Sequence, residues 1–101
     1  MSLVTTHVLD TAKGRPAAGI AVRFETADGK PIADGRTDDD GRIRDLGPDT
    51  LDPGVYRLVF DIGPDAFFPE VVITFRISDG TQHHHVPLLL SPFAYSTYRG
   101  S

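Results

Sequence analysis

The sequence predicts an all-β fold, an antiparallel β-sandwich of seven to eight strands. Short segments rich in Val, Ile, Phe and Thr alternate apolar and polar residues, and no segment has a helical period. The 10 glycines and 8 prolines recur between these segments. Short strands separated by turns are typical of a sandwich of immunoglobulin size. Because 101 residues suffice for one domain and not for two, we expect a single domain over residues 1–101.

Four segments show strand alternation, over residues 4–9, 20–25, 55–62 and 71–78. The last two are the clearest: Tyr56, Leu58 and Phe60 share one face of the third segment, and the fourth repeats the pattern from Val71 to Ile77. Turn residues separate the strands, at Lys13-Gly14, Asp28-Gly29-Lys30-Pro31, Asp40-Gly41, Asp79-Gly80 and Ser91-Pro92.

Composition excludes several classes of function. There is no cysteine, so disulfides, thiolate metal sites and a cysteine nucleophile are excluded. The net charge of −4, without a basic cluster, opposes nucleic-acid binding, and no apolar run is long enough for a membrane helix. Neither a signal peptide nor a peroxisomal ending is visible, so we expect a cytoplasmic protein. A chain this short has little interior for a cavity, so a ligand site is expected between copies.

All four histidines lie in two predicted strands: His7 near the start, and the triplet 83–85. Alternation places His83 and His85 on one face and His84 on the other with Val86. Such a pair can ligate zinc, but the spacing identifies no third ligand, so for the triplet alone we favour a hydrogen-bonded structural role and predict no metal site. The three aspartates 38–40 lack the alternation of a calcium loop and are predicted to form a solvated turn.

The C-terminal segment is unusual, because aromatic residues occupy both faces of its last predicted strand. It runs Ser91-Pro92-Phe93-Ala94-Tyr95-Ser96-Thr97-Tyr98-Arg99-Gly100-Ser101, whereas domain ends are usually polar and poorly ordered. Two interpretations stay open from these residues. The segment is either a docked edge strand or the lining of a site.

Several segments together resemble the 5-hydroxyisourate hydrolases, the transthyretin-related enzymes of urate breakdown. They are Thr6-His7-Val8-Leu9-Asp10, Asp40-Gly41-Arg42, the run His83-His84-His85-Val86-Pro87-Leu88-Leu89-Leu90-Ser91-Pro92, and the ending Tyr98-Arg99-Gly100-Ser101. Further matches fall at residues 14–19, 54–57 and 67–70, so the resemblance covers most of the chain. The terminal tetrapeptide combined with His7 and the histidine segment is its most specific part.

The resemblance implies a prealbumin-like sandwich that assembles as a homotetramer, with active sites where two dimers meet. It implies catalytic roles for His7, Arg42, His85 and Ser101, and substrate contacts from Tyr98 and Arg99. His84 stands where a Tyr is common in the family and is not expected to be catalytic. The stretch 62–66 is shorter than its family counterpart, so the short helix of the family is predicted to be absent.

The resemblance implies hydrolytic ring opening of 5-hydroxyisourate to 2-oxo-4-hydroxy-4-carboxy-5-ureidoimidazoline, without a cofactor. Either His7 or His85 serves as general base in this hypothesis, and Arg42 stabilises the oxyanion. Ser101 orients the substrate and is not a nucleophile. The alternative is a transthyretin-like carrier without catalysis, which the paired histidines and the Tyr-Arg-Gly-Ser ending oppose. A structural module of repeat arrays is a third hypothesis, and it predicts linkers that the sequence lacks.

Overall fold

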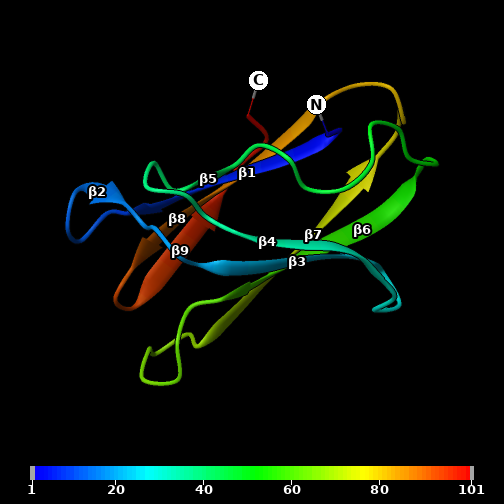
Figure 1. Ribbon diagram of the computed structural model, residues 1–101. Helices are drawn as coiled ribbons and strands as arrows, with labels where there is room; N and C mark the ends of the chain where they lie inside the picture. Colours follow the sequence, from blue (N-terminus) through cyan, green and yellow to red (C-terminus); the bar gives the residue numbers. More distant parts are fainter. Residues whose placement is uncertain (1, 101) are drawn as a thin grey trace.

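A computed structural model describes residues 2–100, which form nine strands in two packed sheets (Figure 1). The first sheet, sheet A, has the order β2-β1-β8-β9 with β5 paired to β1. Its strands are β1 (Val4–Asp10), β2 (Arg15–Pro16), β5 (Arg42–Ile43), β8 (His84–Ser91) and β9 (Ala94–Thr97). The second, sheet B, has the order β4-β3-β6-β7, with β3 (Ala21–Thr26), β4 (Pro31–Arg36), β6 (Gly54–Asp61) and β7 (Glu70–Ile77).

The predicted sandwich is confirmed, and the alternation points the expected residues inward. Val4 and Val8 are fully buried on β1, as are Leu58 and Phe60 on β6. One pairing departs from the antiparallel prediction: β1 and β8 are parallel, with Thr5 opposite His85. Alternation reports which side chains share a face and carries no information on the direction of a neighbouring strand, so the sequence could not predict this pair.

The nine strands exceed the predicted seven to eight, and three of them fall outside all the strands that the sequence indicated. Two of them, β2 and β5, are two residues long, too short for a period to be recognised. The third, β4, is an edge strand that contains Asp34-Gly35, and both residue types are depleted in strands. Its pairing with β3 is irregular at Phe24 and Glu25.

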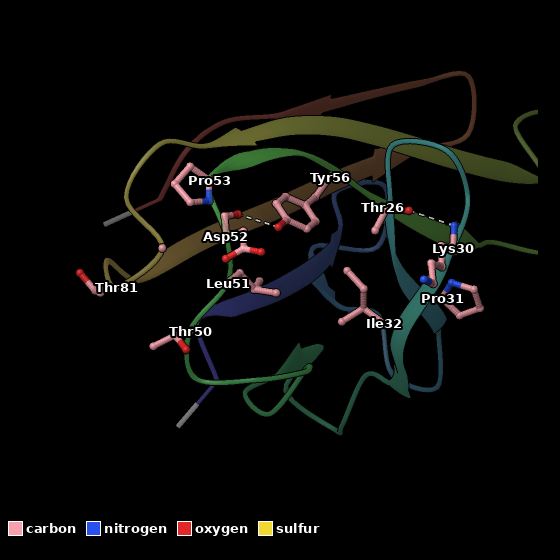
Figure 2. A pocket seen from close by; sticks show the side chains of 11 residues that line it. Thr26, Lys30, Pro31, Ile32, Thr50, Leu51, Asp52, Pro53, Tyr56 and Thr81 are labelled. Carbon is pink, nitrogen blue, oxygen red and sulfur yellow. Dashed lines mark hydrogen bonds between the residues drawn. The ribbon is translucent and has the colours of Figure 1, made fainter.

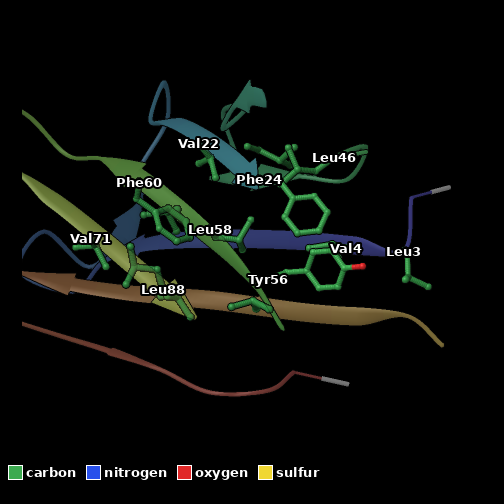
Figure 3. Packing of buried hydrophobic residues seen from close by; sticks show 14 of the residues in the cluster. Leu3, Val4, Val22, Phe24, Leu46, Tyr56, Leu58, Phe60, Val71 and Leu88 are labelled. Carbon is green, nitrogen blue, oxygen red and sulfur yellow. The ribbon is translucent and has the colours of Figure 1, made fainter. Parts of the chain in front are cut away.

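The core lies between the two sheets and is continuous from end to end (Figure 3). Phe24 is fully buried in it, and its ring centroid lies 5.7 Å from that of Tyr56 and 6.2 Å from that of Phe75. Each fully buried large side chain contributes about 1.5–3 kcal/mol to folding. Burial of these side chains therefore holds the two sheets together.

The segment between β6 and β7 is a loop, and the prediction that it lacks a helix is confirmed. Within residues 2–100 there is no helix, and hence none long and apolar enough to cross a membrane. The backbone N–H groups of Ile62 and Gly63 donate to the Pro69 carbonyl oxygen, which closes the loop. Phe67 packs edge-on against Phe93 of the β8–β9 turn, with centroids 5.6 Å apart, so the loop contacts both sheets.

Candidate active site

The candidate site lies on the outer face of sheet A, where β5, β1 and the start of β8 run side by side (Figure 1). In the β1–β5 pairing His7 is opposite Arg42, and in the β1–β8 pairing Thr5 is opposite His85. Thr6 points the other way, into the core, where its hydroxyl donates to the Val86 carbonyl oxygen. Alternation therefore sends Thr5 and His7 to the outward face and Thr6 to the core.

A shallow pocket of about 240 Å³ opens on this face. Its lining includes Thr5, Arg42, Arg44, His83 and His85. Two positively charged guanidinium groups and two imidazole rings therefore line the same pocket. The guanidinium of Arg44 is paired with the Asp38 carboxylate, with Nη1 and Oδ2 3.2 Å apart. Such a pocket suits an electron-rich or anionic ligand with carbonyl oxygens.

The environment of His85 disfavours its charged form. Burial lowers the pKa of its imidazole below the ordinary value, and the nearby Arg42, His83 and His7 lower it further. The depressed pKa keeps the ring neutral at pH 7, with a lone pair on one nitrogen. A neutral imidazole can act as a general base toward a water molecule within hydrogen-bond reach.

His7 is held by the turn that precedes β5. Its Nε2 donates to the carbonyl oxygen of Asp40 at 2.8 Å, which leaves Nδ1 as the nitrogen without that proton in the neutral ring. Gly41 follows in a left-handed conformation, with φ of 76° and its carbonyl oxygen accepting from Val8 N. A Cβ there would lie 2.4 Å from the Val8 carbonyl oxygen, so this close approach requires glycine.

Asp38, the first of the three consecutive aspartates, shapes the same turn. The Asp38 carboxylate accepts from the backbone N–H groups of Arg42 and Asp40, each at 2.9 Å. The bond from Arg42 is the main reason that the pKa of Asp38 lies below its usual value. This turn presents Arg42 at the start of β5, and within residues 2–100 no cluster of three or more histidine or carboxylate side chains could hold a metal ion.

His84 points away from the pocket, as the alternation predicted. Only 4% of it is exposed, on the core side of β8, and its Nδ1 donates to the Gln82 carbonyl oxygen at 2.5 Å. The middle histidine of the triplet therefore has a structural position.

The C-terminal segment returns across β8 toward the site. The N–H of Gly100 donates to the carbonyl oxygen of His85 at 2.8 Å, and the two residues form an isolated bridge. Tyr98 and Arg99 line a different pocket of about 330 Å³, together with His84 and residues of β7. Within one chain the structure brings Arg42, His83 and His85 together in one pocket. His7 lies near enough to His85 to lower its pKa electrostatically. Tyr98 and Arg99 lie in the other pocket. Ser101 lies outside the described residues.

A larger pocket, of about 650 Å³, lies between the β3–β4 hairpin and the segment before β6 (Figure 2). Its polar groups are already paired in places: the Tyr56 hydroxyl donates to the Asp52 carbonyl oxygen, and Lys30 N donates to the Thr26 hydroxyl oxygen. No histidine or arginine lines it. Size alone therefore does not mark the site here.

Known proteins resemble this chain over its whole length. The family model described as HIUase/Transthyretin family matches residues 4–100. The chain belongs to the HIUase/Transthyretin family. It is 48% identical to 5-hydroxyisourate hydrolase of Caulobacter vibrioides, over 100% of both chains. The solved 5-hydroxyisourate hydrolase of Klebsiella pneumoniae superposes with a TM-score of 0.89 at 35% identity, covering 100% of both chains. Sea bream transthyretin, solved in complex with thyroxine, gives a TM-score of 0.85 at 34% identity, over 97% of this chain and 94% of that one.

Three residues of the candidate site, Thr5, His83 and Gly100, were not predicted from the sequence to act there. Thr5 contacts two histidines, His83 shares their pocket, and Gly100 lies against the ring of His85. The strand period already placed Thr5 and His7 on one face, which was a usable signal. The parallel pairing that brings Thr5 to β8 was not predictable, and without it the signal could not be interpreted.

Proposed function

We propose that this chain hydrolyses 5-hydroxyisourate to 2-oxo-4-hydroxy-4-carboxy-5-ureidoimidazoline. The observation that carries the proposal is the convergence of Arg42, His83 and a neutral His85 on one outward pocket. The full-length relatives named 5-hydroxyisourate hydrolase support it. A carrier of the transthyretin kind needs no perturbed imidazole next to a guanidinium.

In the proposed mechanism His85 is the general base. It takes a proton from water while the water oxygen bonds to the carbonyl carbon of the ring amide. Arg42 donates hydrogen bonds to the oxygen on which negative charge develops, the role for which its fixed fork of N–H groups is suited. The C–N bond then breaks, the ring nitrogen takes the proton from the imidazolium, and a carboxylic acid is left on the opened ring.

His85 is preferred to His7 as the base because of their partners. His7 uses Nε2 to donate to the Asp40 carbonyl oxygen, which fixes the ring at the rim of the site. We assign His7 to substrate binding at the rim of the site and leave both proton transfers to His85. Positioned proton transfer is typically worth about 10²–10⁴-fold in rate. Ser101, Tyr98 and Arg99 keep their proposed roles in orienting the substrate.

We further propose a homotetramer whose active sites form where two dimers meet. Tyr98 and Arg99 do not line the His85 pocket of their own chain, so a second copy is one way to supply these groups. Large apolar side chains are exposed on one chain, with Phe67 66%, Phe93 76% and Tyr98 59% exposed. Such exposure is typical of a surface that a partner covers. A cytoplasmic location also stays a prediction.

The test of the function is direct. Urate oxidase generates 5-hydroxyisourate from urate in the cuvette, and its ultraviolet decay is followed with and without the purified chain. We expect decay far faster than the spontaneous rate, in proportion to the amount of chain added. Unaccelerated decay would contradict the enzyme and favour the carrier. Sedimentation of the same sample tests the assembly, with four times the chain mass of 11.0 kDa expected.

A further inference from the structure

The hydroxyl of Thr5 lies between two imidazoles of the site. Its Oγ1 is 2.8 Å from His85 Nδ1 and 2.9 Å from His83 Nε2. The two rings stand on one face of the chain at the start of β8, with centroids 6.4 Å apart and planes 23° from parallel. Thr5 itself is buried, with 7% of its surface exposed, so water has little access to its hydroxyl.

Two arrangements of the protons on these three groups satisfy both hydrogen bonds. A hydroxyl has one hydrogen, so it can donate to one ring, and the other ring must donate to it. In the first arrangement His85 Nδ1–H donates to Thr5 and Thr5 donates to His83 Nε2. His85 Nε2 then carries a lone pair and can act as base. In the second, His83 Nε2–H donates to Thr5, Thr5 donates to His85 Nδ1, and His85 Nε2 carries the proton.

We propose that Thr5 is a positioning residue that sets the tautomer of His85 and joins it to His83 in a proton relay. The inference rests on the proposed function, because it concerns the same base. After His85 Nε2 takes the proton of water, its Nδ1 proton passes to Thr5 Oγ1, and the Thr5 hydroxyl proton passes to His83 Nε2. No atom is gained or lost: the first arrangement becomes the second, with the added positive charge on His83.

The surroundings of the two rings give this transfer a direction. Arg42 from β5, His7 from β1 and His83 itself are the charged or titratable groups that act on His85, and all of them oppose a positive charge there. His83 is exposed, so water can solvate an imidazolium at that position. The relay therefore moves charge from a ring that disfavours it toward solvent, and the reverse transfer returns the proton to His85 for the leaving nitrogen.

Thr5→Val is the decisive variant, since it keeps the branched shape that suits a strand and removes only the hydroxyl. We expect kcat to fall about 10- to 100-fold, the range found when a metal-ligating histidine loses its hydrogen-bond partner. KM should stay within about twofold, because Thr5 acts through His85 and not on the substrate. Thr5→Ser restores a hydroxyl and should recover most of the lost kcat.

A matched control separates the relay from strand pairing. Thr11 follows β1, and its hydroxyl donates to the Leu90 carbonyl oxygen of β8 at 2.7 Å, far from the pocket. Thr11→Val makes the same chemical change at the other end of the β1–β8 pair and should leave kcat unaltered. Histidine ring ¹⁵N shifts supply a readout that needs no substrate: we expect the Nδ1–H form of His85 in the unaltered chain and a mixture in Thr5→Val.

His83→Gln tests the far end of the relay, because glutamine can hydrogen-bond to Thr5 but cannot accept the proton. We expect a lower kcat with KM unchanged. Wild-type kcat in Thr5→Val or in His83→Gln would overturn the relay, and so would an unchanged His85 tautomer in Thr5→Val. Failure of the proposed function is distinguishable, since then the unaltered chain itself would not accelerate decay while the ¹⁵N shifts would still report on Thr5.

Discussion

The outer faces of the two sheets differ in how Arg57 and Arg23 on one and Arg42 on the other are paired with carboxylates. On sheet B, Arg57 and Arg23 lie next to carboxylates, with Arg57 Nε 2.5 Å from Glu25 Oε1 and Arg23 Nε 3.8 Å from Glu25 Oε2. On sheet A, within residues 2–100, no carboxylate pairs with Arg42. Paired charges stabilise a surface, whereas a guanidinium without a carboxylate partner keeps its donors for a ligand. The same strand geometry thus supports a structural face and a chemical face.

Removal of the proposed base should have the largest effect on activity. His85→Ala deletes the proposed base, and kcat/KM is expected to fall by about 10²–10⁴-fold. The chain should remain folded, because His85 points outward and the core side of β8 is unchanged. Ultraviolet decay of 5-hydroxyisourate measures the rate, and circular dichroism checks the fold. A folded variant with wild-type rates would refute the mechanism.

Gly100→Ala should have the next largest effect. A Cβ at Gly100 would lie 2.5 Å from Cδ2 of His85, too close for an alanine unless the ring or the C-terminal segment shifts. A displacement of about 1 Å at a catalytic group can cost about 10²-fold, and we expect a loss of that order in kcat. Gly54→Ala is the control, since its nearest neighbour would be a Tyr56 ring carbon at 3.8 Å. Equal activity of the two variants would show that the close approach does not matter.

The charge of Arg42 should be visible in the pH profile. Burial is the first cause of the low pKa of His85 and Arg42 the second, so Arg42→Gln removes a positive charge that opposes protonation. The pKa of His85 then rises toward its ordinary value. Because the neutral ring is the active form, the acid limb of kcat should move to higher pH. Arg44→Gln, whose charge is paired with Asp38, should leave the limb in place. A limb that stays fixed in Arg42→Gln would place the base elsewhere.

Sequence alone predicted much of sheet A and little of the contacts between its strands. The outward positions of His7, His83 and His85 followed from a period of two, and Arg42 came from a resemblance. The contacts of Thr5 depend on the parallel β1–β8 register, which joins segments 80 residues apart. Such pairings are set by how the two sheets pack, and no local pattern encodes them. The partner of Glu25 was unpredictable for the same reason.

The smallest effect on activity is expected on sheet B. Glu25 is 6% exposed and accepts from Arg57 Nε, so Glu25→Gln leaves a partly buried guanidinium with a weaker partner. We expect a loss of about 1–2 kcal/mol in the free energy of unfolding, reduced from the cost of a fully buried pair because Arg57 is partly solvated. The kcat should be unchanged, since the core separates the two faces. Glu70→Gln, at an exposed pair with Arg23, should change stability less. A fall in kcat that tracked the loss of stability would mean that the two faces are coupled through the core, and the structural face would then also belong to the catalytic machinery.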